Sequence, residues 1–196
     1  MKLFNKWETS HIKVEDPGLV DYINIKPILV PKTFGRNTQK QFKKSNMHIV
    51  ERLANHLYVS GHKRKKHYIS SGHNTGKTMT VFNLLKDTFD IIEKKTQKNP
   101  IEVLVKAVEN AAIREEVTSF QVGGIIVRKA VITSPQRRVD VVLREFVQGS
   151  YQKATGKKKT MAQALAEEIL AAYENNTESY AISEKLRMEK EADSAR

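Results

Sequence analysis

The sequence predicts a mainly α-helical fold: a bundle of about six helices with a protruding β-hairpin arm and a basic N-terminal extension. Apolar residues recur at spacings of three and four over most of residues 45–196, as in helices that bury one face. Two β-rich runs flank a Gly-Gly pair, as in a hairpin. Residues 1–44 show little periodicity and are interrupted by prolines and glycines.

Residues 1–44 are expected to be a basic N-terminal extension that orders on a partner, because their short apolar pieces offer little surface to bury. Residues 45–196 are expected to form one helical domain, with the hairpin arm at about 116–133. The chain of 196 residues can support a sizeable core, since this length buries roughly 70% of the unfolded surface.

The first helix is expected to follow Ser45, whose side chain can cap it, and to bury an apolar stripe over 50–58. The second helix spans about 78–95. The third begins at Asn99-Pro100, where the asparagine side chain caps the helix and the proline suits its first turn.

The arm consists of expected strands at about 116–122 and 125–133. Gly123 and Gly124 connect them, and both glycines can take the positive φ of a tight turn. At about 3.3 Å per residue, each strand of the arm would reach ~25 Å.

Three more helices are expected after the arm. Ser134-Pro135 opens a long one, and residues 160–163 form a capping box at the start of the next. The final helix, at about 183–194, has a thin apolar face with Leu186 as its clearest member.

The charge distribution predicts a polyanionic partner. The net charge is +12 and the pI is about 9.8, which favours binding to nucleic acid or an anionic surface. Between Tyr22 and Lys86 the only acid is Glu51, and residues 117–139 and 146–166 contain none. The cations expected to contact phosphate in these stretches are Arg36, Lys43, Lys44, Lys63, Arg64, Lys65, Lys66, Lys77, Arg128, Lys129, Arg137, Arg138, Lys157, Lys158 and Lys159.

Several classes of protein are disfavoured. The absence of cysteine excludes disulfides and thiolate zinc sites. The N-terminal residues are too polar for a signal peptide, and no apolar run approaches the ~20 residues of a membrane span. We expect no catalytic residue, metal or cofactor. The clustered histidines His48, His56, His62, His67 and His73 are expected to be exposed, and the pairs Glu115-Glu116 and Glu167-Glu168 to be surface charges.

Residues 72–78 read GHNTGKT and resemble a P-loop only in part. A P-loop needs four residues between its glycines, but only three separate Gly72 from Gly76. The preceding residues, HKRKKHYIS, are also unlike the buried strand that leads into a P-loop. A nucleotide site is therefore disfavoured, and a basic loop that binds phosphate in another way stays open.

The segment SPQRRVDVVLR, residues 134–144, predicts an anion site. Arg137 and Arg138 lie in the first turn of a helix, where the macrodipole disfavours cations by about 0.3–1 kcal/mol. A phosphate would compensate, because guanidinium groups and free N–H groups would converge on it. Arg144 extends the same basic face. The alternative is that these arginines pair with acids such as Asp140.

Cations on the expected arm indicate a similar partner. Arg128 and Lys129 are adjacent and therefore point to opposite faces of a strand. An arm with cations on both faces suits insertion between strands of nucleic acid. The alternative is an ordinary exposed hairpin.

Four segments, KNPIEVLVKAVENAAIREEV, VGG, SPQRRVDVVLR and SAR, together resemble the small-ribosomal-subunit protein seven family in its archaeal and eukaryotic branch. The resemblance covers about 45–196 and is most specific over 98–152. It implies a structural, non-catalytic component of the small subunit in the cytoplasm. It also implies binding to the head (3′ major) domain of small-subunit rRNA, nucleation of head assembly, and a place near the exit-site tRNA and the mRNA path.

The resemblance further implies roles for particular residues. The arm tip, Gly123 and Gly124, would approach the tRNA and a neighbouring protein of the head or platform. Two departures stand out: HKRKKHYISSGH resembles an insertion in the inter-helix loop, and the last helix lacks the family's initial run of lysines. The residues implied to face rRNA are Lys77, Arg114, Arg128, Lys129, Arg137, Arg138 and Arg144.

Two alternatives of other classes are kept. One is a P-loop-like nucleotide-binding protein that uses residues 72–78. The other is a helical DNA-binding protein that reads bases from a recognition helix. The predicted cations lie mostly in loops and in the hairpin, which fits shaped RNA better than the major groove of DNA.

Overall fold

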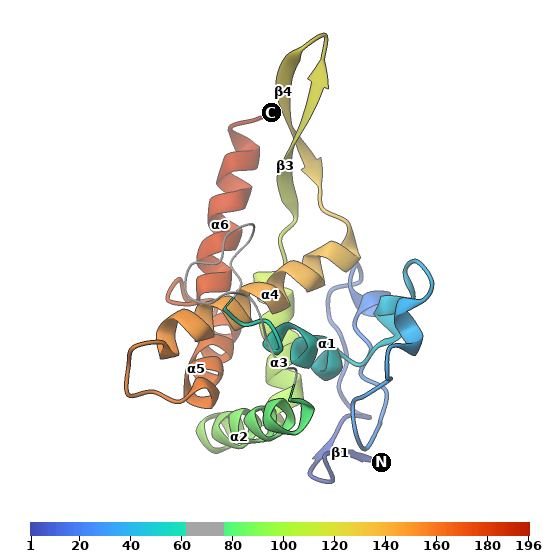
Figure 1. Cartoon of the computed structure of the whole chain (residues 1–196), viewed down its shortest axis with the longest axis vertical. Helices are drawn as coiled ribbons and strands as arrows, with labels where there is room; N and C mark the ends of the chain where they lie inside the picture. Colours follow the sequence, from blue (N-terminus) through green and yellow to red (C-terminus); the bar gives the residue numbers. More distant parts are fainter. Residues whose placement is uncertain (62–76) are drawn as a thin grey trace.

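The computed structural model describes residues 1–61 and 77–196, and it confirms a mainly α-helical bundle with a hairpin arm (Figure 1). The arm projects away from the helices, and the chain's N-terminus lies at the opposite end of the molecule. The six described helices are α1 (Ile49–Leu57), α2 (Thr78–Thr96), α3 (Pro100–Ala111), α4 (Pro135–Ala154), α5 (Met161–Tyr173) and α6 (Tyr180–Asp193). The arm is formed by β3 (Glu115–Val122) and β4 (Ile125–Ile132).

The N-terminal residues form only short elements. Two two-residue strands pair antiparallel, and three 3₁₀ turns follow before α1. These elements are β1 (Lys2–Leu3), β2 (Trp7–Glu8), η1 (Val20–Tyr22), η2 (Arg36–Thr38) and η3 (Lys43–Asn46).

The extension packs into the same core as the helices, which corrects our expectation that it orders only on a partner. Leu3 and Leu19 are fully buried. The ring of Trp7 packs edge-on against Phe89 of α2 with 5.5 Å between centroids, and its indole N–H donates to Glu93 over 3.0 Å. These apolar residues are too irregularly spaced to form a local period, so their burial against a distant helix leaves no pattern in the sequence.

Helix α5 lies at the centre of the bundle, where it contacts α2, α3 and α4. Its apolar side chains Leu165 and Ile169 are fully buried. Fully burying such a side chain contributes about 1.5–3 kcal/mol, so this helix holds the other three together. The expected second helix and the buried stripe of α2, including Phe82 and Leu85, are confirmed.

Helix starts follow the expected caps in two of three cases. The Asn99 side chain accepts from the Ile101 N–H over 3.0 Å at the start of α3, and Thr160 and Gln163 form the capping box of α5. The prediction for α1 is wrong, because Ser45 belongs to η3. The cap is His48, whose Nδ1 accepts from the Val50 N–H over 3.2 Å.

The arm has the expected turn. Val122 pairs with Ile125 across the two-residue connection, and Gly123 and Gly124 have φ of 56° and 88°. This is the left-handed region, which glycine enters without a steric penalty. The antiparallel register continues to Glu115 and Ile132, so the whole length of both strands is paired.

Helix α6 runs beside the base of the arm (Figure 1). Its buried residues are Ala181, Ile182 and Ala192, whereas Leu186 is 50% exposed. The thin apolar face expected around Leu186 is therefore at the surface, and other side chains of α6 pack against the rest of the protein. Two of these three buried residues are alanines, to which a hydropathy pattern alone gives little weight.

Glu168 of α5 is fully buried, so the expectation that it is a surface charge is wrong. Its Oε1 accepts from Ser179 Oγ over 2.8 Å and from the Ala181 N–H over 3.2 Å, at the start of α6. Its Oε2 accepts from Lys153 over 2.5 Å. One carboxylate therefore joins α4, α5 and the first turn of α6, with both oxygens hydrogen-bonded as a buried charge requires.

Gly149 of α4 makes room for this junction. A Cβ at that position would lie 2.6 Å from the Tyr180 Cβ and 3.1 Å from the Glu168 Cδ. Both neighbours are held in place, one by its own backbone and the other by its hydrogen bonds. The glycine therefore sets how closely α4 approaches α6.

We predict that Gly149→Ala destabilises the protein by about 1–3 kcal/mol, as overpacking does. In an ordinary helix interior the same change would stabilise by about 0.5–1 kcal/mol, so the sign alone is diagnostic. Urea unfolding gives the free energy of unfolding. A more stable variant would show that α4 and α6 can separate without cost.

His48 is 2% exposed and caps α1, which corrects the expectation of an exposed imidazole. Burial lowers the pKa of His48 to about 4. Burial is also the main cause that lowers the pKa of the half-buried His56 to about 4. Since the ordinary value is 6.5, both rings are neutral in the folded protein near neutral pH.

We predict that stability falls as the pH is lowered from about 6.5 to about 4. In this window the unfolded chain binds more protons than the folded protein, so each such histidine costs up to about 1.4 kcal/mol per pH unit. His48→Asn retains a capping side chain and should flatten the dependence in urea unfolding. The exposed His11→Asn is the matched control. Equal slopes for both variants would contradict the role of His48.

Candidate nucleic-acid interface

Most of the predicted phosphate-contacting cations that the structure describes lie on the surface. Those in 63–66 lie outside the described residues, as do residues 72–76 of the P-loop-like segment. Lys77 is exposed directly before α2. The other exposed members of the set are Arg36, Lys43, Arg114, Arg128, Lys129, Arg137, Lys157, Lys158 and Lys159.

Arg137 pairs with an acid, but not with the one considered from the sequence. Its Nε and Nη2 each donate to a carboxylate oxygen of Glu116 on β3 over 2.7 Å. This hydrogen bonding raises the pKa of Arg137. Its side chain is still 54% exposed, so solvent weakens the pair. Glu116 is thus a partner of this arginine and not a free surface charge.

The other two arginines of α4 form weaker contacts with neighbouring groups than Arg137 does. Arg138 donates from Nε to the Thr133 carbonyl over 2.9 Å, and within the described residues it forms no ion pair. Arg144 lies beside Glu145, with 3.5 Å between Nη2 and Oε1. Both side chains are partly exposed on one helix with Arg137. The three arginines of the predicted anion site therefore lie on one helix, and phosphate binding there stays a prediction.

Asp140 pairs with cations of the preceding segments. Its Oδ1 accepts from Arg52 Nη2 and its Oδ2 from Lys44 Nζ, both over 2.9 Å. Burial raises the pKa of Asp140, but the hydrogen bonds from Lys44 and Arg52 outweigh it, and the net pKa lies below its ordinary value. Lys44 therefore uses one of its three N–H donors in this pair, and a phosphate contact would use the remaining donors.

Arg52 was not singled out from the sequence, although it is the central member of this network. Its side chain is fully buried, and its Nη1 donates to the Tyr22 carbonyl over 2.8 Å. A signal was available, since an arginine beside Val50 and Leu53 interrupts the apolar stripe of α1. The network fixes η1, η3 and α1 against the start of α4.

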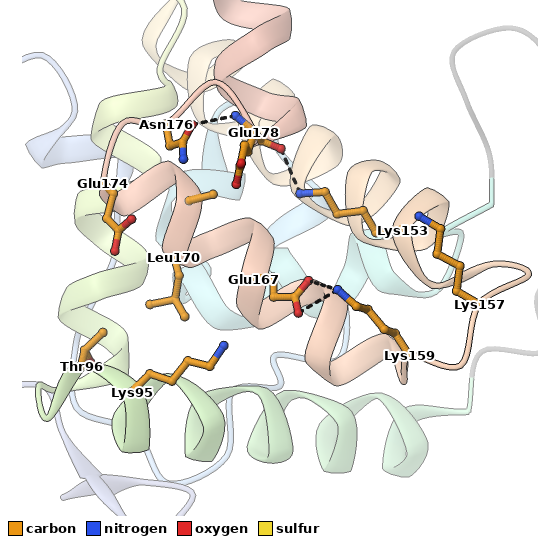
Figure 2. A pocket seen from close by; sticks show the side chains of 11 residues that line it. Lys95, Thr96, Lys153, Lys157, Lys159, Glu167, Leu170, Glu174, Asn176 and Glu178 are labelled. Carbon is orange, nitrogen blue, oxygen red and sulfur yellow. Dashed lines mark hydrogen bonds and ion pairs between the residues drawn. The ribbon is translucent and has the colours of Figure 1, made fainter.

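Lysines at the end of α4 and directly after it border a surface groove of about 560 Å³ (Figure 2). Lys159 donates to both oxygens of Glu167 over 2.8 and 3.0 Å, and Lys153 donates to the Glu178 carbonyl over 3.0 Å. Lys157 points along the same groove without such a partner in the figure. Lys159 is thus paired, and Lys157 is the freer of the two for a phosphate.

The arm presents its cations as expected. Arg128 and Lys129 lie opposite Ser119 and Thr118, on different faces of the hairpin, and both are exposed. At the arm's base, Arg196 pairs with Glu115 over 2.5 Å. Adjacent residues of a strand point to opposite faces. The two acids at the start of β3 are therefore held from opposite sides, one by the C-terminal arginine and the other by α4.

Over 1–61 and 77–196, no group of three or more His, Cys, Asp or Glu side chains is arranged to hold a metal ion. In the same ranges, no helix combines the length and the apolar character needed to cross a bilayer.

Comparison with known proteins identifies a family. The family described as "Ribosomal protein S7p/S5e" matches residues 20–196. The "Small ribosomal subunit protein uS7" of Nanoarchaeum equitans is 50% identical over 196 residues, which is 100% of this chain and 99% of that protein. The proteins of the same name from Archaeoglobus fulgidus and Methanococcus aeolicus are 44% and 43% identical. They cover 99% and 100% of this chain, and 94% and 99% of their own lengths.

The Asp140 network generates a prediction about stability. Arg52→Met should lower the free energy of unfolding by about 2–4 kcal/mol, because it leaves the Tyr22 carbonyl and one oxygen of the partly buried Asp140 carboxylate without their hydrogen bonds from Arg52. Lys44→Met removes a half-exposed cation from the same carboxylate and should cost less than about 1 kcal/mol. Urea unfolding of both variants tests this order. Equal costs would mean that Arg52 is not the anchor of α4.

Proposed function

Because the chain belongs to the ribosomal protein S7p/S5e family, we propose that it binds the head (3′ major) domain of small-subunit rRNA and nucleates assembly of the head. As a member of this family it is a structural protein of the small ribosomal subunit in the cytoplasm, and the family is not one of enzymes. This confirms the family predicted from the sequence.

The observation that supports head-domain rRNA binding is the gathering of partly exposed arginines along α4, close to the arm. Arg137, Arg138 and Arg144 present guanidinium groups within one helix, and the first two lie in its first turn. Free N–H groups and cations at a helix start suit a phosphate. The net charge of +12 adds attraction that needs no sequence recognition.

Glu116 holds Arg137 in place before RNA binds. A carboxylate and a phosphate both accept two parallel N–H bonds from a guanidinium group. We therefore expect an RNA phosphate to replace or join Glu116 at Arg137. This reconciles the ion pair with the predicted phosphate site: the acid keeps the arginine ordered and lowers the entropy lost on binding.

The arm is the part of the chain proposed to approach the exit-site tRNA and the mRNA path. Its tip carries exposed apolar side chains, with Ile125 and Ile126 each 71% exposed. Exposed apolar residues together with cations on both faces suit an element that lies between RNA and a neighbouring protein. Proteins of the head and platform are the proposed neighbours.

The test is a salt-titrated binding assay that compares a head-domain rRNA fragment with an unrelated structured RNA of equal length. We expect a preference for the head fragment that persists at physiological salt, because shape and not charge alone would set it. Each phosphate neutralised should steepen the log–log salt slope by roughly 0.7–0.9. Equal binding to both RNAs, or a preference for duplex DNA, would contradict the proposal.

Charge reversal locates the interface. Arg137→Glu with Arg138→Glu should weaken binding to the head fragment at least about tenfold and make the salt slope shallower. Helix α4 should persist, since acids are favoured at a helix start; because Arg137→Glu also removes the pair with Glu116, thermal unfolding of the variant checks the rest of the fold. The matched control is Arg187→Glu with Lys190→Glu, which changes the net charge equally on the exposed side of α6. Equal losses for the two pairs would indicate attraction without a defined site.

A further inference from the structure

A surface groove of about 560 Å³ lies where η1, η3, α1 and the start of α4 meet. It combines aromatic, cationic and neutral polar side chains with the carboxylate of Asp140, which the cations outnumber, and it is unlike the lysine–glutamate groove beside α5. The lining residues used below are Tyr22, Phe42, Lys44, His56, Arg137 and Arg144. Its size falls within the roughly 300–1,000 Å³ of small-molecule sites, which is large enough for one nucleotide.

Phe42 supplies an aromatic face without being part of the core. Its side chain is 65% exposed, and its backbone is in the left-handed region with φ of 64°. Such a conformation costs a residue other than glycine about 1–3 kcal/mol, and it tends to occur where a ligand is bound. An exposed phenylalanine in a strained conformation at the edge of a groove points to a stacking partner.

The cations of the groove retain capacity for an anion. Arg137 donates from Nε and Nη2 to Glu116, so its Nη1 group is still available to donate to an anion. The side chains of Lys44 and Arg144 are 39% and 37% exposed. The Arg144 Nε is buried and finds no hydrogen-bond partner among the described residues. Phosphate oxygens could therefore be accepted at the groove without breaking the Asp140 network.

His56 adds an imidazole ring that can form hydrogen bonds with an uncharged part of a ligand. Its ring is neutral, mainly because burial lowers its pKa to about 4, with Lys44 as the next cause. A neutral imidazole has one donor and one acceptor, and it can hydrogen-bond the edge of a base. Recognition of a phosphate alone requires only cations and N–H donors, so the neutral imidazole and the aromatic ring indicate that the ligand also contains a base.

We propose that this groove binds one unpaired RNA nucleotide, with its base stacked on Phe42 and its phosphates at Arg144 and Lys44. The inference rests on the proposed rRNA function and names the class of ligand at this point of the interface. Unpaired bases that stack on aromatic side chains are the usual basis of RNA recognition outside helices. An acidic peptide would match the cations but would leave the Phe42 ring unused.

The test uses the full chain and the head-domain rRNA fragment. Phe42→Ala should weaken binding roughly 5- to 150-fold, which is the effect of losing one stacked base. The log–log salt slope should not change, because no phosphate contact is removed. Phe34→Ala is the matched control: Phe34 is also an exposed phenylalanine of the N-terminal extension with positive φ, but it lines a different groove, and Lys32 already lies over its ring, 4.9 Å from the centroid.

A second measurement reports stacking directly. Phe42→Trp places an indole in the groove, and its emission should be quenched when the RNA fragment binds, whereas Phe34→Trp should not respond. The native Trp7 is buried and hydrogen-bonded to Glu93, so it contributes a constant background. Thermal unfolding of each variant checks that the fold is retained.

The outcomes separate this inference from the proposed function. If the wild-type chain does not prefer the head fragment, the proposed function fails, and the groove proposal fails with it. If the wild type binds normally but Phe42→Ala and Phe34→Ala have equal affinities, only the groove proposal is overturned. A changed salt slope for Phe42→Ala would also overturn it, since the residue would then act through charge and not through stacking.

Discussion

The buried guanidinium group of Arg52 is the constraint on which the arrangement around α4 depends. A charge without solvent must be matched, and here Asp140 and the Tyr22 carbonyl match it from two directions. Because Asp140 belongs to α4 and Tyr22 to the extension, satisfying one side chain fixes both relative to α1. The position of α4 in turn determines where its arginines and the base of the arm lie. The core gives the bundle its stability, while this polar contact gives α4 its placement.

The base of the arm is fixed in a comparable way. Glu115 and Glu116 point to opposite faces of β3 and are held by Arg196 and Arg137. Both pairs are partly exposed, so each contributes little to stability by itself. Their effect is geometric, because a strand held on both faces cannot rotate freely about its own axis. The direction in which this narrow arm projects is therefore constrained at its base.

The sequence allowed much of the fold to be predicted, because periodicity, caps and the Gly-Gly turn are local signals. The start of α3 at Asn99, the arm and the capping box of α5 were all predicted in this way. Burial that depends on distant partners was not predictable: Trp7, His48 and Glu168 are polar or irregularly placed residues whose environment is set by helices far along the chain. The site was predicted as a set of cations, but the carboxylates that pair with them depend on three-dimensional contacts.

The two-stranded arm has a further consequence for the chain before it is assembled. Among the residues that the structure describes, no third strand pairs with the backbone groups along either edge, and the tip of the arm carries exposed β-branched residues such as Ile125 and Ile126. A bare edge of this kind is a template for adding strands from other copies, which is how aggregation begins. Arg128 and Lys129 interrupt the apolar run with like charges that repel a second copy. The cations of the arm therefore stand where they would oppose the addition of strands from other copies of the free chain.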